Sequence, residues 1–210
     1  MSPNVIPLMD KVTTPSSWFT AIFYKPVWTV QLLSHAIPWK SKTNPTKTYP
    51  GVLSFIQALR TSTPPFETSN LKIGAAGFCW GGKHTFLLAA DKPSSRVKRH
   101  ESQLDPTINL PLLDAAFTAH PSYIDVPKDV DAITTPLSIA VGDEDMAMKA
   151  PLVRKMKEIL DEKKGSYEVI IFEGAKHGFA VRTHPEDEKE MECAKKAEDQ
   201  AIEWFGKCFQ

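Results

Sequence analysis

From residue 48 to its end, the chain alternates between amphipathic segments and short apolar segments bounded by turn residues. In residues 48–62 the apolar side chains recur every three or four positions, which predicts a helix. The same spacing in residues 149–165 predicts a second helix, and Gly165 ends it. Residues 184–205 predict a terminal helix, because Pro185 suits a first turn and the acidic start suits the helix dipole.

Short apolar segments between these helices predict four strands. They cover residues 71–78, 113–120, 136–145 and 167–174. A further helix is expected over residues 81–91, directly after the first strand. Strands that alternate with helices pair in parallel, so the predicted fold class is α/β, a three-layer sandwich with a mostly parallel sheet. The long polar segment 92–112 is expected to be a surface insertion.

The first part of the chain has a different pattern. Residues 1–47 contain no segment that predicts a strand, whereas residues 17–39 are strongly apolar. Lys25 and Pro26 interrupt this apolar segment, and the remainder is too short and too polar to span a bilayer. We therefore expect residues 1–47 to form a helical or loop cover, and residues 48–210 to form the α/β core of a single domain.

Composition narrows the function classes. The chain has 25 basic and 25 acidic residues, and a formal net charge of zero gives no support to nucleic-acid binding. Three cysteines without a CxxC pair argue against a disulfide framework, a zinc ribbon and a thioredoxin motif. Reduced thiols and a start that does not resemble a signal peptide predict a cytoplasmic protein.

The segment Gly77-Phe78-Cys79-Trp80-Gly81 has the form G-x-nucleophile-x-G, with cysteine as the nucleophile. It lies between a predicted strand and a predicted helix, which is the context of a nucleophile elbow. The turn strains the nucleophile's backbone, and the flanking glycines are expected to leave room for it. The backbone N–H of Trp80 is then a candidate oxyanion-hole donor, and the helix N-terminus lowers the pKa of the thiol. The alternative is a small buried cysteine in a tight turn.

A cysteine nucleophile needs a base, and the base needs an acid that orients it. His177 follows the fourth predicted strand, in a loop that contains glycine. Asp143, Glu144 and Asp145 follow the third strand. Because the carboxyl ends of parallel strands meet at one edge of a sheet, these side chains are candidates for a site with Cys79. A structural histidine and a solvated acidic turn are the alternatives.

Three motifs resemble those of the dienelactone hydrolase family, especially its fungal members. They are KIGAAGFCWGG (72–82), VGDEDMAM (141–148) and GAKHGFAVR (174–182). The resemblance extends over most of residues 5–206 and implies an α/β-hydrolase-type fold. It also implies a Cys79, His177 and Asp145 triad that cleaves small esters or lactones through an acyl-enzyme, without a cofactor or a metal.

The resemblance implies further roles. Arg182 lies near the position where the family often has an arginine that binds a substrate carboxylate, although a surface ion pair is the alternative. His120, at the end of the second strand, could line the pocket or have a structural role. The implied partner is a small ester or lactone from secondary metabolism or aromatic degradation, with no nucleic acid and no membrane span. The protein is expected to be a monomer or a homodimer.

One departure from the family leaves two hypotheses open. Because 78 residues precede Cys79, the α/β-hydrolase fold is expected to be N-terminally shortened and to lack its first strands. The first hypothesis is a cysteine-dependent hydrolase of esters or lactones, with a thioesterase as a close variant. The second is a catalytically impaired protein that binds a ligand or partner through an exposed sheet edge.

Overall fold

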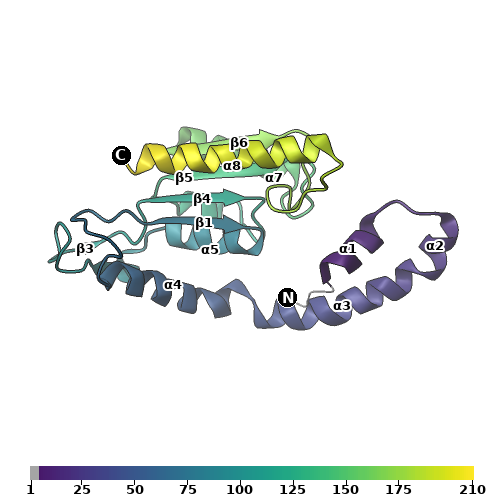
Figure 1. Cartoon of the computed structure of the whole chain (residues 1–210), viewed down its shortest axis with the longest axis horizontal. Helices are drawn as coiled ribbons and strands as arrows, with labels where there is room; N and C mark the ends of the chain where they lie inside the picture. The colour runs from purple at the N-terminus through teal and green to yellow at the C-terminus, as the bar shows by residue number, and fades with distance from the viewer. Residues whose placement is uncertain (1–4) are drawn as a thin grey trace. The chain divides into compact units, whose positions relative to one another are not determined.

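The computed structural model describes residues 5–210 and divides the chain into two compact units, residues 1–50 and 51–210. The first unit is helical (Figure 1). Its helices are α1 (Val5–Thr13), α2 (Trp18–Phe23), α3 (Lys25–Lys42) and the start of α4 (Pro45–Thr61). Both α1 and α2 pack against α3. The Ser17 hydroxyl caps α2 by accepting a hydrogen bond from the Thr20 N–H.

The apolar side chains of α2 and α3 lie largely at the surface of this unit. Trp18 is 74% exposed and Val30 is 68% exposed, and neither helix contains a buried residue. These helices lie in the segment expected to be a helical or loop cover, of which residues 1–4 lie outside the described residues. Its role as a cover stays a prediction. Within residues 5–210, no helix has both the length and the apolar character that crossing a membrane requires.

The second unit contains a four-stranded parallel sheet with the order β1-β4-β5-β6. Its strands are β1 (Gly74–Phe78), β4 (Ala115–Ala119), β5 (Leu137–Gly142) and β6 (Tyr167–Phe172). All four predicted strands and their parallel pairing are therefore confirmed. The register aligns Phe78 with Ala119 and Ala119 with Ala140, so the carboxyl ends of the strands meet along one edge.

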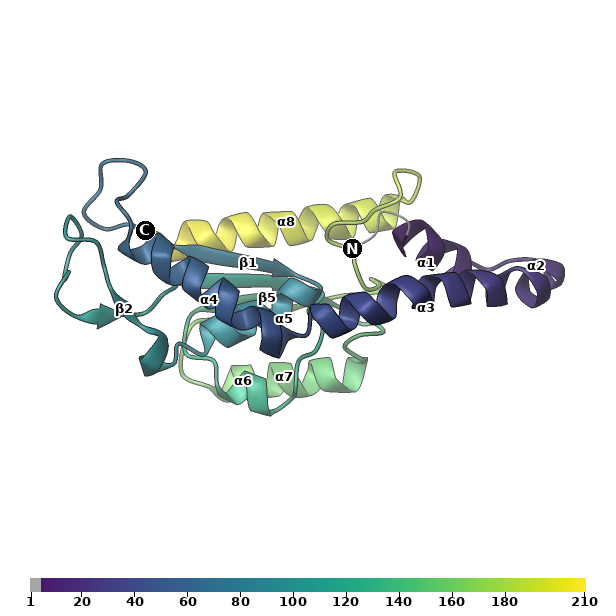
Figure 2. The same ribbon diagram turned by 90° about the horizontal axis from the view of Figure 1, so that it is seen from below.

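Helices cover both faces of this sheet. Figure 2 shows α8 on one face and α5, α6 and α7 on the other. These helices are α5 (Trp80–Ala89), α6 (Lys128–Asp131), α7 (Ala150–Glu162) and α8 (Glu188–Cys208). The apolar face predicted for α7 is buried at Val153, Met156 and Leu160 and partly buried at Ile159. The three-layer α/β arrangement follows from these positions.

The two central strands form the core. Every residue of β4 and β5 is buried, as expected for strands that helices cover on both faces. On the α8 side, an apolar cluster joins the sheet to α8 and to the loop after β6. Its members are Phe117, Ala119, Ala140, Phe172, Ala175, Phe179, Ala197 and Trp204. The loop after β6 is thus packed into the core.

The second half of α4 is tied to the starts of two strands through Arg60. This side chain is 2% exposed, donates to the Leu71 carbonyl at 2.8 Å and pairs with Asp114 at 2.6 Å. Asp114 precedes β4, and its carboxylate also accepts the Ile73 N–H at 2.7 Å. The pairing compensates the buried guanidinium charge and aligns the amino ends of β1 and β4.

Segment 92–112 is mostly exposed, as expected of a surface insertion, but it also contains regular structure and buried contacts. It contains a 3₁₀ turn (Pro93–Ser95) and two short antiparallel strands, β2 (Val97–Lys98) and β3 (Asn109–Leu110). Gln103 is buried, accepts the Leu71 N–H at 2.6 Å and donates to the Thr68 carbonyl at 2.6 Å. The sequence did not predict that Gln103 is buried, because a glutamine whose hydrogen bonds are satisfied by backbone groups looks the same as an exposed one in a hydropathy pattern.

Candidate active site

Cys79 occupies a strained turn between β1 and α5, as the elbow motif predicted. Its backbone has φ 52° and ψ −117°, a conformation that L-residues rarely adopt. At Gly77 a Cβ atom would lie 2.0 Å from the Thr85 hydroxyl, so this glycine is required. The expectation for Gly81 is wrong, because a Cβ there would meet nothing within 4 Å. The second tight position is Gly82, where a Cβ would lie 2.6 Å from the Pro121 Cβ.

Backbone hydrogen bonds fix this turn to the end of β4. The Cys79 N–H donates to the Ala119 carbonyl at 3.2 Å. The Cys79 carbonyl accepts the N–H of Gly82 at 3.1 Å and that of Ser122 at 2.9 Å. These bonds offset the strain and hold the thiol at the carboxyl edge of the sheet.

His177 lies between the thiol and a carboxylate. Its Nε2 is 3.0 Å from Cys79 Sγ, and its Nδ1 is 2.9 Å from Asp145 Oδ1. The Asp145 side chain is fully buried, and Oδ1 also accepts the Ala147 N–H at 2.7 Å. Sequence reasoning thus named three residues that the fold brings into one hydrogen-bonded line.

The neighbouring carboxylates do not face His177. Asp143 Oδ1 accepts the N–H of Gly174 at 2.7 Å, which fixes the start of the loop after β6. Glu144 is exposed. Asp145 is therefore the acid of this run whose position orients the imidazole.

The charges of the line favour a thiolate beside an imidazolium. Burial disfavours the charged imidazole, but hydrogen bonds to Asp145 and Cys79 and their negative charges raise the pKa of His177 to about 9. Burial likewise opposes the thiolate, yet His177, the Ser122 hydroxyl and the Trp80 N–H together lower the pKa of Cys79 below the ordinary thiol value. The contacts within the pair thus shift the thiol toward its charged form and the imidazole toward its protonated form.

Ser122 belongs to this cluster and was missed by sequence reasoning. Its Oγ lies 3.7 Å from Cys79 Sγ and 3.4 Å from His177 Nε2. The residue is 8% exposed. Its position just beyond the second predicted strand was the available signal, since that strand ends at the same sheet edge.

His120 lies beneath His177 rather than at the surface of the site. It is fully buried, and its ring centroid is 5.1 Å from that of His177 and 5.8 Å from that of Phe179. Burial lowers the pKa of His120 to about 4, and the charge of His177 adds to this effect, so the ring is neutral. The predicted role of His120 in substrate binding stays a prediction.

Arg182 is close to the line of Asp145, His177 and Cys79. Its Nη2 donates to the His177 carbonyl at 3.4 Å, and its guanidinium lies over Gly178, where a Cβ would be 2.7 Å from Nη2. Trp80 begins α5, so its N–H is one of the donors at the helix N-terminus beside the thiol. Trp80 thus contacts the sulfur through its N–H, and Arg182 contacts the backbone of His177.

The remaining thiols lack this environment. Cys193 and Cys208 lie in α8, both are free, and burial raises the pKa of Cys208. Within the described part of the chain, no group of three His, Cys, Asp or Glu side chains is arranged to hold a metal ion. Of the three cysteines, Cys79 is therefore the one beside a histidine and a buried carboxylate.

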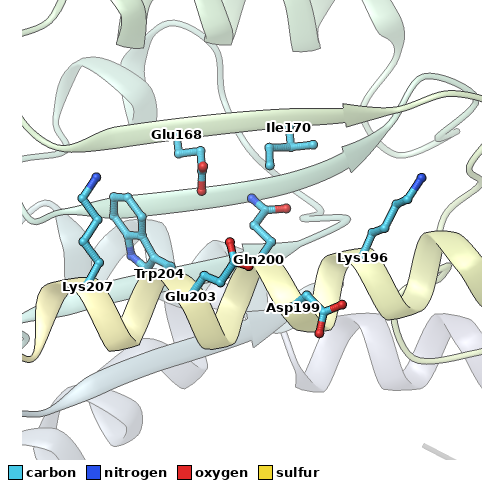
Figure 3. Close-up of a pocket in the computed structure, with 8 residues that line it drawn as sticks. All are labelled: Glu168, Ile170, Lys196, Asp199, Gln200, Glu203, Trp204 and Lys207. Carbon is cyan, nitrogen blue, oxygen red and sulfur yellow. The ribbon is translucent and has the colours of Figure 1, made fainter.

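A separate hollow of about 410 Å³ lies between β6 and α8 (Figure 3). Its lining residues are mostly polar or charged. They are Glu168, Ile170, Lys196, Asp199, Gln200, Glu203, Trp204 and Lys207. None of the Cys79, His177 and Asp145 side chains borders it.

The parallel sheet with a cysteine elbow at its carboxyl edge defines the α/β-hydrolase class of fold. Residues 40–209 match the dienelactone hydrolase family, and the chain belongs to this family. A solved dienelactone hydrolase-like promiscuous phosphotriesterase from metagenomic libraries supports the fold. It has a TM-score of 0.55 at 18% identity, and the match covers 84% of this chain and 67% of that one.

Two curated fungal proteins are similar in sequence. The chain is 34% identical over 134 residues to hydrolase tropI of Talaromyces stipitatus, covering 64% of this chain and 45% of that protein. It is 27% identical over 165 residues to hydrolase pyvD of Aspergillus violaceofuscus, covering 73% of this chain and 59% of that protein. The chain thus spans about half the length of the curated relatives it matches.

Proposed function

We propose that this protein hydrolyses small esters or lactones, with Cys79 as nucleophile, His177 as acid and base, and Asp145 as the orienting carboxylate. One observation carries the proposal: Asp145, His177 and Cys79 form a continuous hydrogen-bonded line that ends on a strained elbow. Membership of a hydrolase family supports the reaction class. Its cytoplasmic location and a place in secondary metabolism stay predictions.

The first half-reaction transfers the acyl group to sulfur. The Cys79 thiolate attacks the carbonyl carbon, and the electron pair of the C=O bond moves to oxygen. The Trp80 N–H donates to this oxyanion. As the tetrahedral intermediate collapses, the bond to the alcohol oxygen breaks, and that oxygen takes the Nε2 proton of His177. The product alcohol stays attached to the acyl group when the substrate is a lactone.

The second half-reaction returns the enzyme to its starting state. Neutral His177 accepts a proton at Nε2 from a water molecule, and the water oxygen attacks the thioester carbon. When the C–S bond breaks, sulfur leaves as a thiolate beside the imidazolium, so the charged pair is restored. The carboxylic acid product releases its own proton to solvent.

Arg182 supports a preference for substrates that carry a carboxylate. Its guanidinium is held over Gly178, next to the backbone of His177. An arginine in this place can bind a carboxylate through two parallel hydrogen bonds. The proposed partner is therefore a small ester or lactone with a second, anionic group.

The acyl-enzyme gives a direct test. The protein is mixed with p-nitrophenyl acetate, quenched in acid within seconds and measured by intact-mass and peptide mass spectrometry. We expect one acetyl group on Cys79, and Cys79→Ala should reduce p-nitrophenol release by about 10³-fold or more. Cys193→Ala is the matched control and should retain the wild-type rate.

Acetylation of Cys193 or Cys208 instead of Cys79 would contradict the nucleophile assignment. A folded protein without any acyl adduct and without turnover would instead favour the second hypothesis, a hydrolase-fold protein that binds a ligand or partner. Release of a thiol from an acyl thioester, faster than release from the matched ester, would identify the thioesterase variant.

A further inference from the structure

We propose that Ser122 is a positioning residue whose hydroxyl serves Cys79 and His177 in turn. The inference rests on the proposed function and extends it to a side chain outside the triad. Ser122 Oγ lies 3.7 Å from Sγ and 3.4 Å from Nε2, while these two atoms are 3.0 Å apart. The hydroxyl therefore forms the third corner of a triangle with the reacting pair.

In the resting state the thiolate needs hydrogen-bond donors. His177 Nε2–H donates one bond to sulfur, and the Ser122 hydroxyl is placed to donate a second. A hydrogen bond to an ionised acceptor is stronger than one between neutral groups. Because Ser122 is 8% exposed, little water reaches this position to replace the hydroxyl. The serine thus favours the charged form of Cys79.

In the tetrahedral intermediate the sulfur no longer needs a hydrogen-bond donor. Once sulfur is bonded to the acyl carbon it has no negative charge and is a weak acceptor, while the imidazolium still carries its Nε2 proton until the alcohol leaves. The Ser122 oxygen can then accept from Nε2–H and keep the ring in place. A hydroxyl can do both because it donates one hydrogen and accepts through its lone pairs. An alanine could do neither.

The turn that positions Ser122 contains two strained backbone conformations. His120 and Tyr123, the residues on either side of Pro121 and Ser122, have φ values of 39° and 63°. Neither is glycine, so both conformations are strained. The resulting turn directs the Ser122 N–H onto the Cys79 carbonyl at 2.9 Å, which places the serine directly beside the elbow. Strain at a functional site is retained when surrounding bonds fix it.

The experiment is alkylation of Cys79 by iodoacetamide as a function of pH, followed by peptide mass spectrometry. In Ser122→Ala we expect the midpoint of the rate profile to move up by about half to one pH unit, and the rate below the midpoint to fall by about three- to tenfold. Ser122→Thr keeps the hydroxyl and should restore the midpoint. Ser138→Ala removes a buried β5 hydroxyl whose partners are Glu168 and Gln200, and it should leave the midpoint unchanged.

Alkylation needs no substrate, so this test is independent of the proposed hydrolysis. A Ser122→Ala protein with the wild-type melting temperature and an unmoved midpoint would overturn the positioning role, whatever the esterase rate. An acyl group found on Ser122 itself would also overturn it, since the serine would then be a nucleophile. Failure of Cys79→Ala to reduce turnover would instead overturn the proposed function and leave the thiol result intact.

Discussion

The carboxyl edge of the sheet and the hollow between β6 and α8 are both lined by connected polar side chains. At the edge, Asp145, His177 and Cys79 follow one another at hydrogen-bond distance. Beside the hollow, Gln200 Nε2 donates to Ser138 Oγ at 2.8 Å, and Ser138 donates to Glu168 at 2.7 Å. The line of Gln200, Ser138 and Glu168 has a cavity next to it, whereas the line of Asp145, His177 and Cys79 contains a thiol and an imidazole.

The two lines of side chains differ because they lie at different positions along the strands. Ser138 and Glu168 lie within β5 and β6, where regular backbone leaves the side chains to satisfy one another. Cys79 and His177 lie beyond strand ends, where a strained turn and a loop free their side chains to converge. At the edge the pKa of the Cys79 thiol is lowered and that of the His177 imidazole is raised. A hollow by itself does not shift the pKa values of its lining residues in this way. The comparison indicates that geometry at strand ends, rather than cavity size, identifies the site.

Removing the negative charge from the edge should have the largest effect. In Asp145→Asn the amide cannot stabilise the imidazolium and favours the wrong tautomer of His177, so kcat/KM for a nitrophenyl ester should fall on the order of 10³-fold. Asp143→Asn keeps an oxygen that can accept the Gly174 N–H, and it serves as the matched control with less than about threefold loss. Equal losses in both variants would show that the loop, and not the charge on Asp145, matters.

Removing the imidazole should have the next largest effect, and it should appear in labelling without substrate. His177→Ala deletes both the hydrogen bond and the positive charge next to sulfur, so iodoacetamide labelling of Cys79 at pH 7 should slow by about ten- to thirtyfold. The pKa of Cys208 is not influenced by His177, so its labelling rate should not change. If Cys79 and Cys208 respond alike, the elbow is a structural turn.

The pH dependence should separate turnover from labelling. Turnover needs the thiolate and the imidazolium together, so it should rise as Cys79 loses its proton, below the ordinary thiol pKa, and fall tenfold per pH unit above about 9, as His177 loses its proton. Labelling needs the thiolate alone and should persist above pH 9. Parallel profiles for the two rates, measured from pH 5 to 10.5, would be inconsistent with His177 as the proton donor.

Changing the line beside the hollow should have the smallest effect. Among the described residues, the buried Gln200 Oε1 has no hydrogen-bond partner, so Gln200→Leu removes an unsatisfied acceptor together with one good bond. These changes oppose each other, and the free energy of unfolding in urea should change by less than about 1 kcal/mol. The esterase rate should stay within twofold of wild type. A loss of activity with unchanged stability would make the hollow part of the site.

Much of the catalytic edge could be predicted because each residue follows a strand. The motif around Cys79 and the loop position of His177 depend on local order alone, and parallel pairing then brings the strand ends together. The choice of Asp145 over Asp143 came from the family resemblance. The structure explains that choice, because the Asp143 carboxylate is occupied by the Gly174 N–H.

The parts that could not be predicted depend on contacts between distant segments. Ser122 reaches Cys79 only through the pairing of β1 with β4, and its place after a strand end does not by itself show that its hydroxyl faces the thiol. Gly82 is required by Pro121, a residue from the neighbouring strand end, whereas the motif directs attention to Gly81. In the same way, the buried Gln103 is fixed by backbone groups about 30 residues earlier in the chain.

The packing of Phe172, Ala175 and Phe179 against α8 makes the segment that carries His177 part of the core rather than an independent loop. The N–H groups of Ala175 and Phe179 bond within the segment, to Phe172 and Lys176. Opening it would expose these aromatic rings, so its amides should exchange with deuterated solvent about as slowly as those of α8. On heating, esterase activity and the circular-dichroism signal of the helices should therefore be lost in one cooperative transition. The second unit should not populate an inactive state that keeps its fold.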